Sequence, residues 1–192
     1  DFWDDDSMQR EFLPGIIDES KDKLVEFLGC IDTGIKDISY EKIDDKIRIY
    51  TTHTGKNGKD YTLGLYNESD GTLKSILLYI LARVAILNDK SLFIDELNDR
   101  LHPLLLKYII DLFYESDSMA QLIYTTHDTT LMDKKFFRRD QIWFVQKDEY
   151  GYSELVALSD YKVRSDASFE KDYLAGVYGG IPFLKEFQMK EK

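Results

Sequence analysis

The sequence predicts an α/β fold with a parallel βαβ core that is flanked by β-hairpins and helices. Two short apolar runs, "SLFI" and "QLIY", are separated by the helical stretch "PLLLKYIIDLFY". Strand, helix and strand at this spacing are typical of parallel pairing, and strands that are apolar along their length are expected in a sheet covered on both faces. Because 192 residues are the size of one ordinary domain, we expect a single domain over residues 1–192.

The composition disfavours several classes of protein. A formal net charge of -11 and a pI of about 4.7 would repel a phosphate backbone and an anionic membrane surface, although they leave room for a local basic patch. No secretory signal pattern opens the chain, and no apolar run approaches the ~20 residues that span a bilayer. A single cysteine, Cys30, rules out an internal disulfide framework. We therefore expect a cytoplasmic protein with no membrane partner.

The first part of the sequence predicts a helix and then a hairpin. The opening stretch "DFWDDDSMQREF" is polar and lacks a turn signal, so the chain resembles one that is entered partway. From about Asp18, apolar residues at near-helical spacing predict a helix with Asp18 as its N-cap and an end near Gly29. "KIRIYTTH" and "DYTLGLY" then alternate apolar and polar residues around the turn "GKNGK", which predicts a β-hairpin.

After the hairpin, the spacing of the apolar residues changes from that of a strand to that of a helix. In "ESDGTLKSILLYILARVAIL" apolar residues recur at steps of three and four, which predicts a helix that starts near Ser69 or Asp70. The βαβ unit follows. After it, "QIWFVQKD" and "SELVALSD" flank the turn "DEYGY" and predict a second hairpin.

Polar side chains follow both strands of the predicted parallel pair. Asp95 and Glu96 directly follow "SLFI", and "QLIY" is followed by Thr125, Thr126, His127 and Asp128. The carboxyl ends of parallel strands meet at one edge of a sheet, where ligands bind in open α/β folds. The sequence therefore predicts a polar site at this edge.

These residue types fit the hydrolysis of a nucleotide, which needs a metal, a group that activates water and donors to the phosphoryl oxygens. Asp95 fits the Mg²⁺ shell through water, because magnesium prefers hard oxygen ligands and keeps much of its hydration. Glu96 fits a general base, and His127 fits a group that senses or polarises the γ-phosphate. Each has an ordinary alternative: a strand end that runs into a turn, or a hydrogen-bonded structural histidine. For Ser69 to Gly71 the alternative is a simple helix cap.

Five stretches also carry a family resemblance. They are "ESDGTLKSILLY", "LFIDELNDRLHPLLLKYIIDLF", "QLIYTTHDTTLMD", "RRDQIWFVQKD" and "YLAGVYGGIPFL". In this order they resemble the carboxyl-terminal half of the AAA15-type ATPases, which are bacterial ABC-like P-loop ATPases related to the SMC and OLD-nuclease heads. The resemblance extends from about Leu24 to Leu184 and is most specific between Glu68 and Asp148. It implies the carboxyl-terminal lobe of an ABC-type ATPase head.

The resemblance implies roles for the candidate residues. "SDGT" is the counterpart of the ABC signature motif, which contacts nucleotide held by the other subunit; it comprises Ser69, Asp70, Gly71 and Thr72. Asp95 and Glu96 are the Walker B pair, on Mg²⁺ and as general base, and His127 is the switch histidine. Asn98 and Asp99 fall in the D-loop. ATP and Mg²⁺ are therefore the implied ligands, and a homodimer of heads is the implied assembly.

The chain departs from the usual ABC pattern in two places. The signature carries one glycine where transporters have two, a departure that this family shares. The phosphate-binding loop GxxxxGK[ST], or Walker A, is missing, since "GKNGKD" has neither its spacing nor its Ser/Thr. We therefore expect the carboxyl-terminal part of a longer ATPase, or one half of a split protein, whose partner is an amino-terminal segment that carries Walker A.

Three functions are open at this point. The leading hypothesis is ATP binding and hydrolysis in a head dimer that regulates a nuclease or toxin effector in phage defence or abortive infection. The alternative is a non-catalytic interaction lobe of a split or truncated ATPase. A metal-dependent nuclease that uses Asp95 and Glu96 is a weaker third, because such sites usually gather several carboxylates. The sequence leaves nucleic-acid binding through missing segments open.

Overall fold

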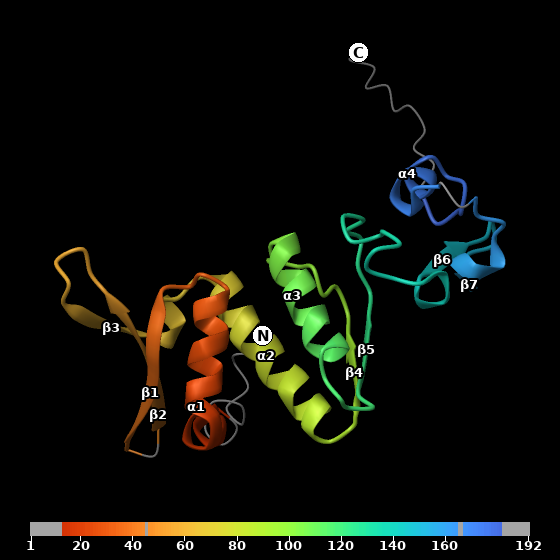
Figure 1. The fold of residues 1–192 in the computed structure, drawn as a ribbon. Helices are drawn as coiled ribbons and strands as arrows, with labels where there is room; N and C mark the ends of the chain where they lie inside the picture. The colour runs from red at the N-terminus through yellow and green to blue at the C-terminus, as the bar shows by residue number, and fades with distance from the viewer. Residues whose placement is uncertain (1–12, 45, 165–166, 182–192) are drawn as a thin grey trace, which may run out of the picture. The chain divides into compact units, whose positions relative to one another are not determined.

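The computed structural model describes residues 13–44, 46–164 and 167–181 of the chain (Figure 1). The chain separates into two compact units, Asp1–His127 and Asp128–Lys192, and each is described by itself. The opening stretch and the end of the last family-like stretch, 182–184, lie outside the described residues. That residues 1–192 form one domain stays a prediction.

The first unit contains an antiparallel sheet of three strands in the order β1-β2-β3. The strands are β1 (Ile35–Ile43), β2 (Lys46–Thr54) and β3 (Asp60–Gly64). The predicted hairpin of β2 and β3 is confirmed, and its turn is closed by a hydrogen bond of 2.9 Å from the Gly55 N–H to the Lys59 carbonyl. The central strand β2 therefore has a neighbour on each side.

Strand β1 was not predicted from the sequence. Its register with β2 shifts between Ile35 and Asp37. An irregularity of this kind moves later side chains to the other face and breaks the strict alternation by which a strand is recognised. The buried Ile35 and Ile38 are accordingly three residues apart.

The helix α1 (Leu13–Cys30) begins earlier than the sequence predicted. Leu13 and Ile17 are buried, so the packed face of the helix extends upstream of Asp18. Asp18 is not an N-cap; its carboxylate accepts a hydrogen bond of 2.8 Å from the Tyr40 hydroxyl. The backbone at Ser20 is non-helical and kinks the helix, which explains why the sequence pattern becomes clear only after that point.

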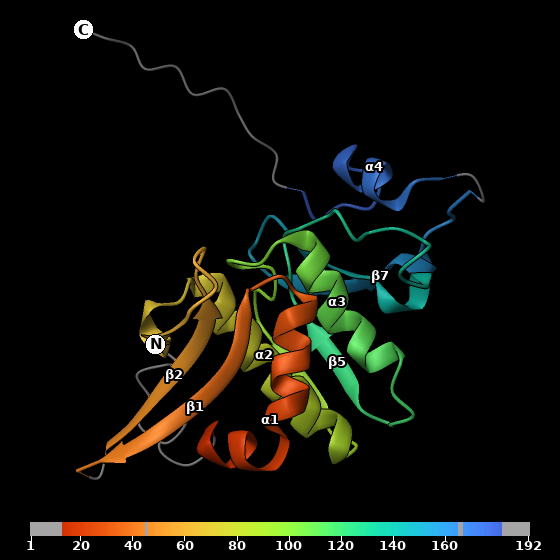
Figure 2. The same ribbon diagram turned by 60° about the vertical axis from the view of Figure 1, so that its left-hand side comes forward.

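The helix α2 (Asp70–Leu87) is the central helix of this unit, and its predicted start is confirmed. The Ser69 hydroxyl oxygen caps it by accepting a hydrogen bond of 3.1 Å from the Thr72 N–H. α1 lies between the antiparallel sheet and α2 (Figures 1 and 2). The rings of Phe27 and Tyr79 stack between α1 and α2 with centroids 4.4 Å apart.

The predicted βαβ unit is confirmed. It comprises β4 (Ser91–Ile94), α3 (Pro103–Tyr114) and β5 (Gln121–Tyr124), and β4 pairs with β5 in parallel. α3 starts where expected, with Pro103 in its first turn and His102 as N-cap. α2 and α3 pack against the strand pair (Figure 2).

One face of the β4–β5 pair differs from the expectation of a sheet covered on both sides. Phe93 and Ile123 are register partners, and 71% and 44% of their surfaces are exposed. Leu92 and Ile94, the alternating residues of β4, are half-buried. In the described part of the chain, the pair is therefore covered on a single face.

The second unit is built around the predicted second hairpin, which is confirmed. Its strands are β6 (Trp143–Lys147) and β7 (Ser153–Ala157), and the short helix α4 (Phe169–Leu174) follows. The buried core of this unit comprises Phe144, Leu158, Phe169 and Tyr178. Burial, together with a hydrogen bond to Asp172, raises the pKa of the Tyr178 phenol to about 12.

Within the ranges that the structure describes, no helix combines the length and the apolar character that crossing a bilayer requires.

Candidate functional site

Asp95 and Glu96, which directly follow β4, are hydrogen-bonded to Thr125, which directly follows β5. The Thr125 hydroxyl donates a hydrogen bond to the Asp95 carboxylate and accepts one of 2.9 Å from the Glu96 N–H. The next N–H, of Leu97, donates to the Thr125 carbonyl at 3.1 Å. Both carboxylates stay exposed to solvent. The parallel topology therefore gathers Asp95 and Glu96 at the sheet edge, as predicted, and Thr125 holds the Asp95 carboxylate and the Glu96 N–H.

The backbone at Glu96 has a left-handed conformation, with a φ of 48°. This region is uncommon for residues other than glycine and persists where the surroundings hold it. Here Leu97, which is fully buried, anchors the chain directly after Glu96. The Asp99 N–H then donates to the Glu96 carbonyl at 3.0 Å and closes the turn.

The predicted D-loop and switch residues also meet at this edge. The Asn98 side-chain nitrogen lies 3.3 Å from His127 Nε2. The Thr126 hydroxyl donates to Asn98 Oδ1 at 2.7 Å, which leaves the amide nitrogen of Asn98 to face the histidine. Because an amide nitrogen can only donate, the contact fits a His127 ring whose Nε2 carries no proton.

The predicted signature residues form the start of α2. Ser69 precedes the helix, and Asp70, Gly71 and Thr72 form its first turn. Free N–H groups and the helix dipole make such a terminus favourable for an anion. Ser69 and Thr72 also share a hydrogen bond of 2.9 Å between their hydroxyl groups.

The start of α2 contacts the loop that follows β4. Arg100 Nη1 donates to Asp70 Oδ2 at 3.0 Å, and Lys74 Nζ donates to the Glu96 carbonyl at 3.2 Å. Burial lowers the pKa of the Lys74 ammonium, an effect that the charge of Asp99 opposes. The residues predicted as the signature and those predicted as the Walker B pair therefore lie in one connected network within the first unit.

The glycine in this network has a packing role. A Cβ atom at Gly71 would lie 3.2 Å from the Arg100 carbonyl oxygen, which is closer than most such contacts. We expect Gly71→Ala to lose the stabilisation of ~0.5–1 kcal/mol that Ala normally brings to a helix, because the loop must shift. Urea unfolding measures this, and Gly29→Ala is the matched control, since no atom of the described residues beyond its chain neighbours and its own helix backbone lies within 4 Å of that Cβ position. Equal stabilisation by the two variants would contradict the prediction.

The donors at this edge fit a magnesium ion bound mainly through water. Asp95 offers an exposed carboxylate next to the Thr125 hydroxyl, and both are hard oxygen donors. Among the described residues, no three His, Cys, Asp or Glu side chains gather closely enough to hold a metal ion. Water and phosphate oxygens would have to supply the other ligands, which is the usual arrangement for Mg²⁺.

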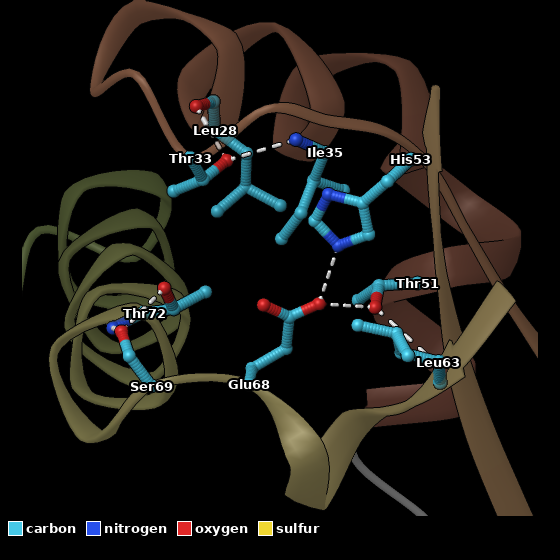
Figure 3. Close-up of polar contacts among 9 residues, drawn as sticks. All are labelled: Leu28, Thr33, Ile35, Thr51, His53, Leu63, Glu68, Ser69 and Thr72. Carbon is cyan, nitrogen blue, oxygen red and sulfur yellow. Dashed lines mark hydrogen bonds and ion pairs between the residues drawn. The ribbon is translucent and has the colours of Figure 1, made fainter. Parts of the chain in front are cut away.

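Sequence reasoning missed a buried polar cluster beside the signature residues. His53, which the sequence indicated only as a strand-end residue, has its Nε2 atom 2.7 Å from Glu68 Oε1 (Figure 3). The Thr51 hydroxyl donates to the same carboxylate oxygen. The sequence contained one indication of this cluster. Thr51 and His53 are two residues apart in a strand, so both polar side chains lie on the same face.

A known protein family matches the part of the chain that contains the candidate site. Residues 4–133 match a family model described as "AAA domain, putative AbiEii toxin, Type IV TA system". No curated protein matches the chain. All of the candidate site residues, from Ser69 to His127, lie within the matched range.

The fold is similar to that of a solved SMC ATPase chain described under "Structural biochemistry of ATP-driven dimerization and DNA stimulated activation of SMC ATPases". The TM-score is 0.56 and the sequence identity 16%, and the similarity covers 82% of this chain and 89% of that chain. At this identity the likeness shows the fold alone: an α/β fold like an ABC-type ATPase head, with a parallel strand pair and flanking antiparallel hairpins. Since the family model matches more than half of the 192 residues, the chain belongs to the AAA-domain family described as putative AbiEii toxins of type IV toxin–antitoxin systems.

Proposed function

We propose that this chain is the carboxyl-terminal lobe of an ABC-like ATPase of the AAA15 type, which binds and hydrolyses ATP as a dimer of heads. The AAA-domain family supports the ATPase class. The observation that carries the proposal is the fastening of Asp95 and Glu96 to Thr125, with His127 held at the same edge by Asn98. In this proposal these neighbouring residues are the metal-binding, water-activating and phosphate-sensing groups that the reaction requires.

Each residue at the edge has one task in this proposal. Asp95 holds Mg²⁺ through water, and bound Mg²⁺ neutralises charge on the phosphates. Glu96 accepts the proton of the attacking water as its oxygen bonds to the γ-phosphorus and the bond to the bridging oxygen breaks. His127 hydrogen-bonds the γ-phosphoryl group. The position of His127 then depends on whether the γ-phosphoryl group is present. Through its contact with Asn98, a shift of His127 moves the D-loop.

The signature residues act on nucleotide held by the other head. Ser69 and the free N–H groups of the first turn of α2 receive its phosphate, while Asn98 and Asp99 line the contact between heads. Two identical heads related by a twofold axis place one such terminus at each of two nucleotides. The ATP-driven dimerisation named for the SMC relative supports this assembly here.

An amino-terminal segment that carries Walker A is the proposed partner within each head. The 192 residues contain no GxxxxGK[ST] loop. In the described part of the chain, β4 and β5 pair only with each other, and Phe93 and Ile123 are exposed on one face. Parallel sheets are normally covered on both faces, so strands and helices of the proposed amino-terminal segment would complete this sheet.

Nucleotide binding tests the composite head. We expect calorimetry with Mg²⁺ and a non-hydrolysable ATP analogue to show binding when this chain is mixed with the Walker A segment, and none by this chain alone. In the mixture, Asp95→Asn should weaken binding by at least ~10-fold, about 1.4 kcal/mol, because a metal-binding carboxylate is lost. Tight binding by this chain alone would overturn the composite assignment.

The biological role belongs to the same proposal. A cytoplasmic head dimer that switches a nuclease or toxin effector in phage defence or abortive infection fits a family whose description names AbiEii toxins. The alternative is a lobe that assembles but does not catalyse. It is favoured by the missing Walker A loop, and a mixture that binds ATP without hydrolysing it would support it.

A further inference from the structure

We infer that Glu68 is a positioning residue, which holds Ser69 and Gly71 in place by tethering the start of α2 to the antiparallel sheet. The tether itself is read from the contacts, whereas its effect on turnover rests on the function proposed above. The inference concerns the cluster of Thr51, His53 and Glu68 in Figure 3.

The Glu68 carboxylate is largely buried, and one of its oxygens, Oε1, contacts two side chains of β2. Only 8% of its side chain and 12% of that of His53 are exposed, and Thr51 is fully buried. Its Oε1 atom lies 2.7 Å from His53 Nε2 and accepts a hydrogen bond from the Thr51 hydroxyl. A carboxylate removed from water is costly unless its oxygens are hydrogen-bonded in this way. The cost of breaking these contacts therefore holds the side chain where it is.

The two residues that contact the Glu68 carboxylate belong to the central strand of the antiparallel sheet. Thr51 and His53 belong to β2, which is hydrogen-bonded to β1 on one side and β3 on the other. The His53 ring also stacks on Tyr61 of β3, with ring centroids 5.6 Å apart. The position of the Glu68 carboxylate is thus fixed by the sheet rather than by α2.

The backbone of Glu68 joins that anchor directly to the signature residues. Its N–H donates to the Leu65 carbonyl at 3.0 Å, and Leu65 is buried. The next residue, Ser69, caps α2 through the Thr72 N–H. With Glu68 held at both its backbone and its side chain, the peptide that carries Ser69 has little freedom, and the start of α2 is positioned from outside the helix.

Hydrogen exchange tests the tether without ATP. We expect Glu68→Ala to speed exchange of the Thr72 and Leu73 amides by at least ~10-fold, because local opening of the helix start becomes easier. Glu68→Gln should stay near wild type, since its amide oxygen still accepts both hydrogen bonds. Asp60→Ala is the matched control: it removes an acid that pairs with Thr54 at 2.5 Å in the same sheet. Unchanged exchange in a folded Glu68→Ala protein would overturn the tether.

A milder variant covers the case in which Glu68→Ala fails to fold. His53→Phe keeps a ring that can stack on Tyr61 and removes one of the two hydrogen bonds to Glu68. We expect it to speed exchange at the same two amides by a smaller factor. A folded His53→Phe protein whose Thr72 and Leu73 amides exchange at the wild-type rate would also overturn the tether.

The rate of ATP hydrolysis by the assembled ATPase tests whether Glu68 acts by positioning Ser69. We expect Glu68→Ala to lower kcat by ~10-fold with KM for ATP within about twofold, and Glu68→Gln to restore most of the rate. In a Ser69→Ala background the same change should cost less than about twofold, because the group that it positions is already gone. Additive losses would overturn the positioning role. A wild-type assembly without ATPase activity would instead reject the proposed function, while the exchange experiment still decides the tether.

Discussion

Glu96→Gln in the assembled ATPase is expected to lower the rate of ATP hydrolysis by ~10²–10⁴-fold, the usual contribution of a general base. Glutamine has the same shape but cannot take a proton from water. The contact that fixes this position is made by the backbone N–H of Glu96 to Thr125, so the substitution leaves it in place. ATP binding and dimerisation should therefore persist.

Single-turnover phosphate release and nucleotide binding should be measured on the same preparation. Asp117→Asn is a suitable control, because it neutralises an exposed acid in the loop before β5. A Glu96→Gln protein that hydrolyses ATP at the wild-type rate would reject the general-base role. Loss of ATP binding together with hydrolysis would assign the residue to binding rather than to chemistry.

The second large effect is expected in stability. Leu97 is fully buried immediately after Glu96. Leu97→Ala should lower the free energy of unfolding by ~2–5 kcal/mol, because it removes buried apolar surface and leaves a cavity. The loop between Glu96 and Asp99 would lose its anchor at the same time, so turnover should fall more than nucleotide binding.

Leu104→Ala is the matched control for this substitution. It is the same chemical change at a residue that is 72% exposed, and surface changes of this kind usually stay within about 0.5 kcal/mol. Urea unfolding of the two variants under identical conditions makes the comparison. If Leu97→Ala proved as mild as Leu104→Ala, the packing of this loop against the core would be in doubt.

The elements that local pattern specifies could be predicted. The spacing of "SLFI", "PLLLKYIIDLFY" and "QLIY" indicated the parallel pair, and Ser69 marked the start of α2. The early start of α1 was missed because it depends on the burial of Leu13 and Ile17, which is a tertiary effect. β1 was missed because its register shift breaks the alternation.

The candidate site, like the fold, could be predicted from the sequence only in part. Topology alone places Asp95, Glu96 and His127 at one edge, because parallel strands end together. The fastening by Thr125 and the contact between Asn98 and His127 depend on side-chain geometry, which the residue pattern does not contain. The pairing of His53 with Glu68 joins residues 15 positions apart, and no local period marks it. The chemical roles of these residues stay predictions.

The left-handed backbone of Glu96 has a consequence for how this loop evolves. This conformation costs most residues a free energy of ~1–2 kcal/mol. Glycine does not bear this cost, and asparagine tolerates the conformation better than most residues. A lineage selected for thermal robustness alone would therefore drift toward glycine or asparagine at position 96. If Glu96 has the proposed catalytic role, copies of this domain released from catalysis should show that drift first, and a retained glutamate in a related sequence would mark a domain still selected for that role.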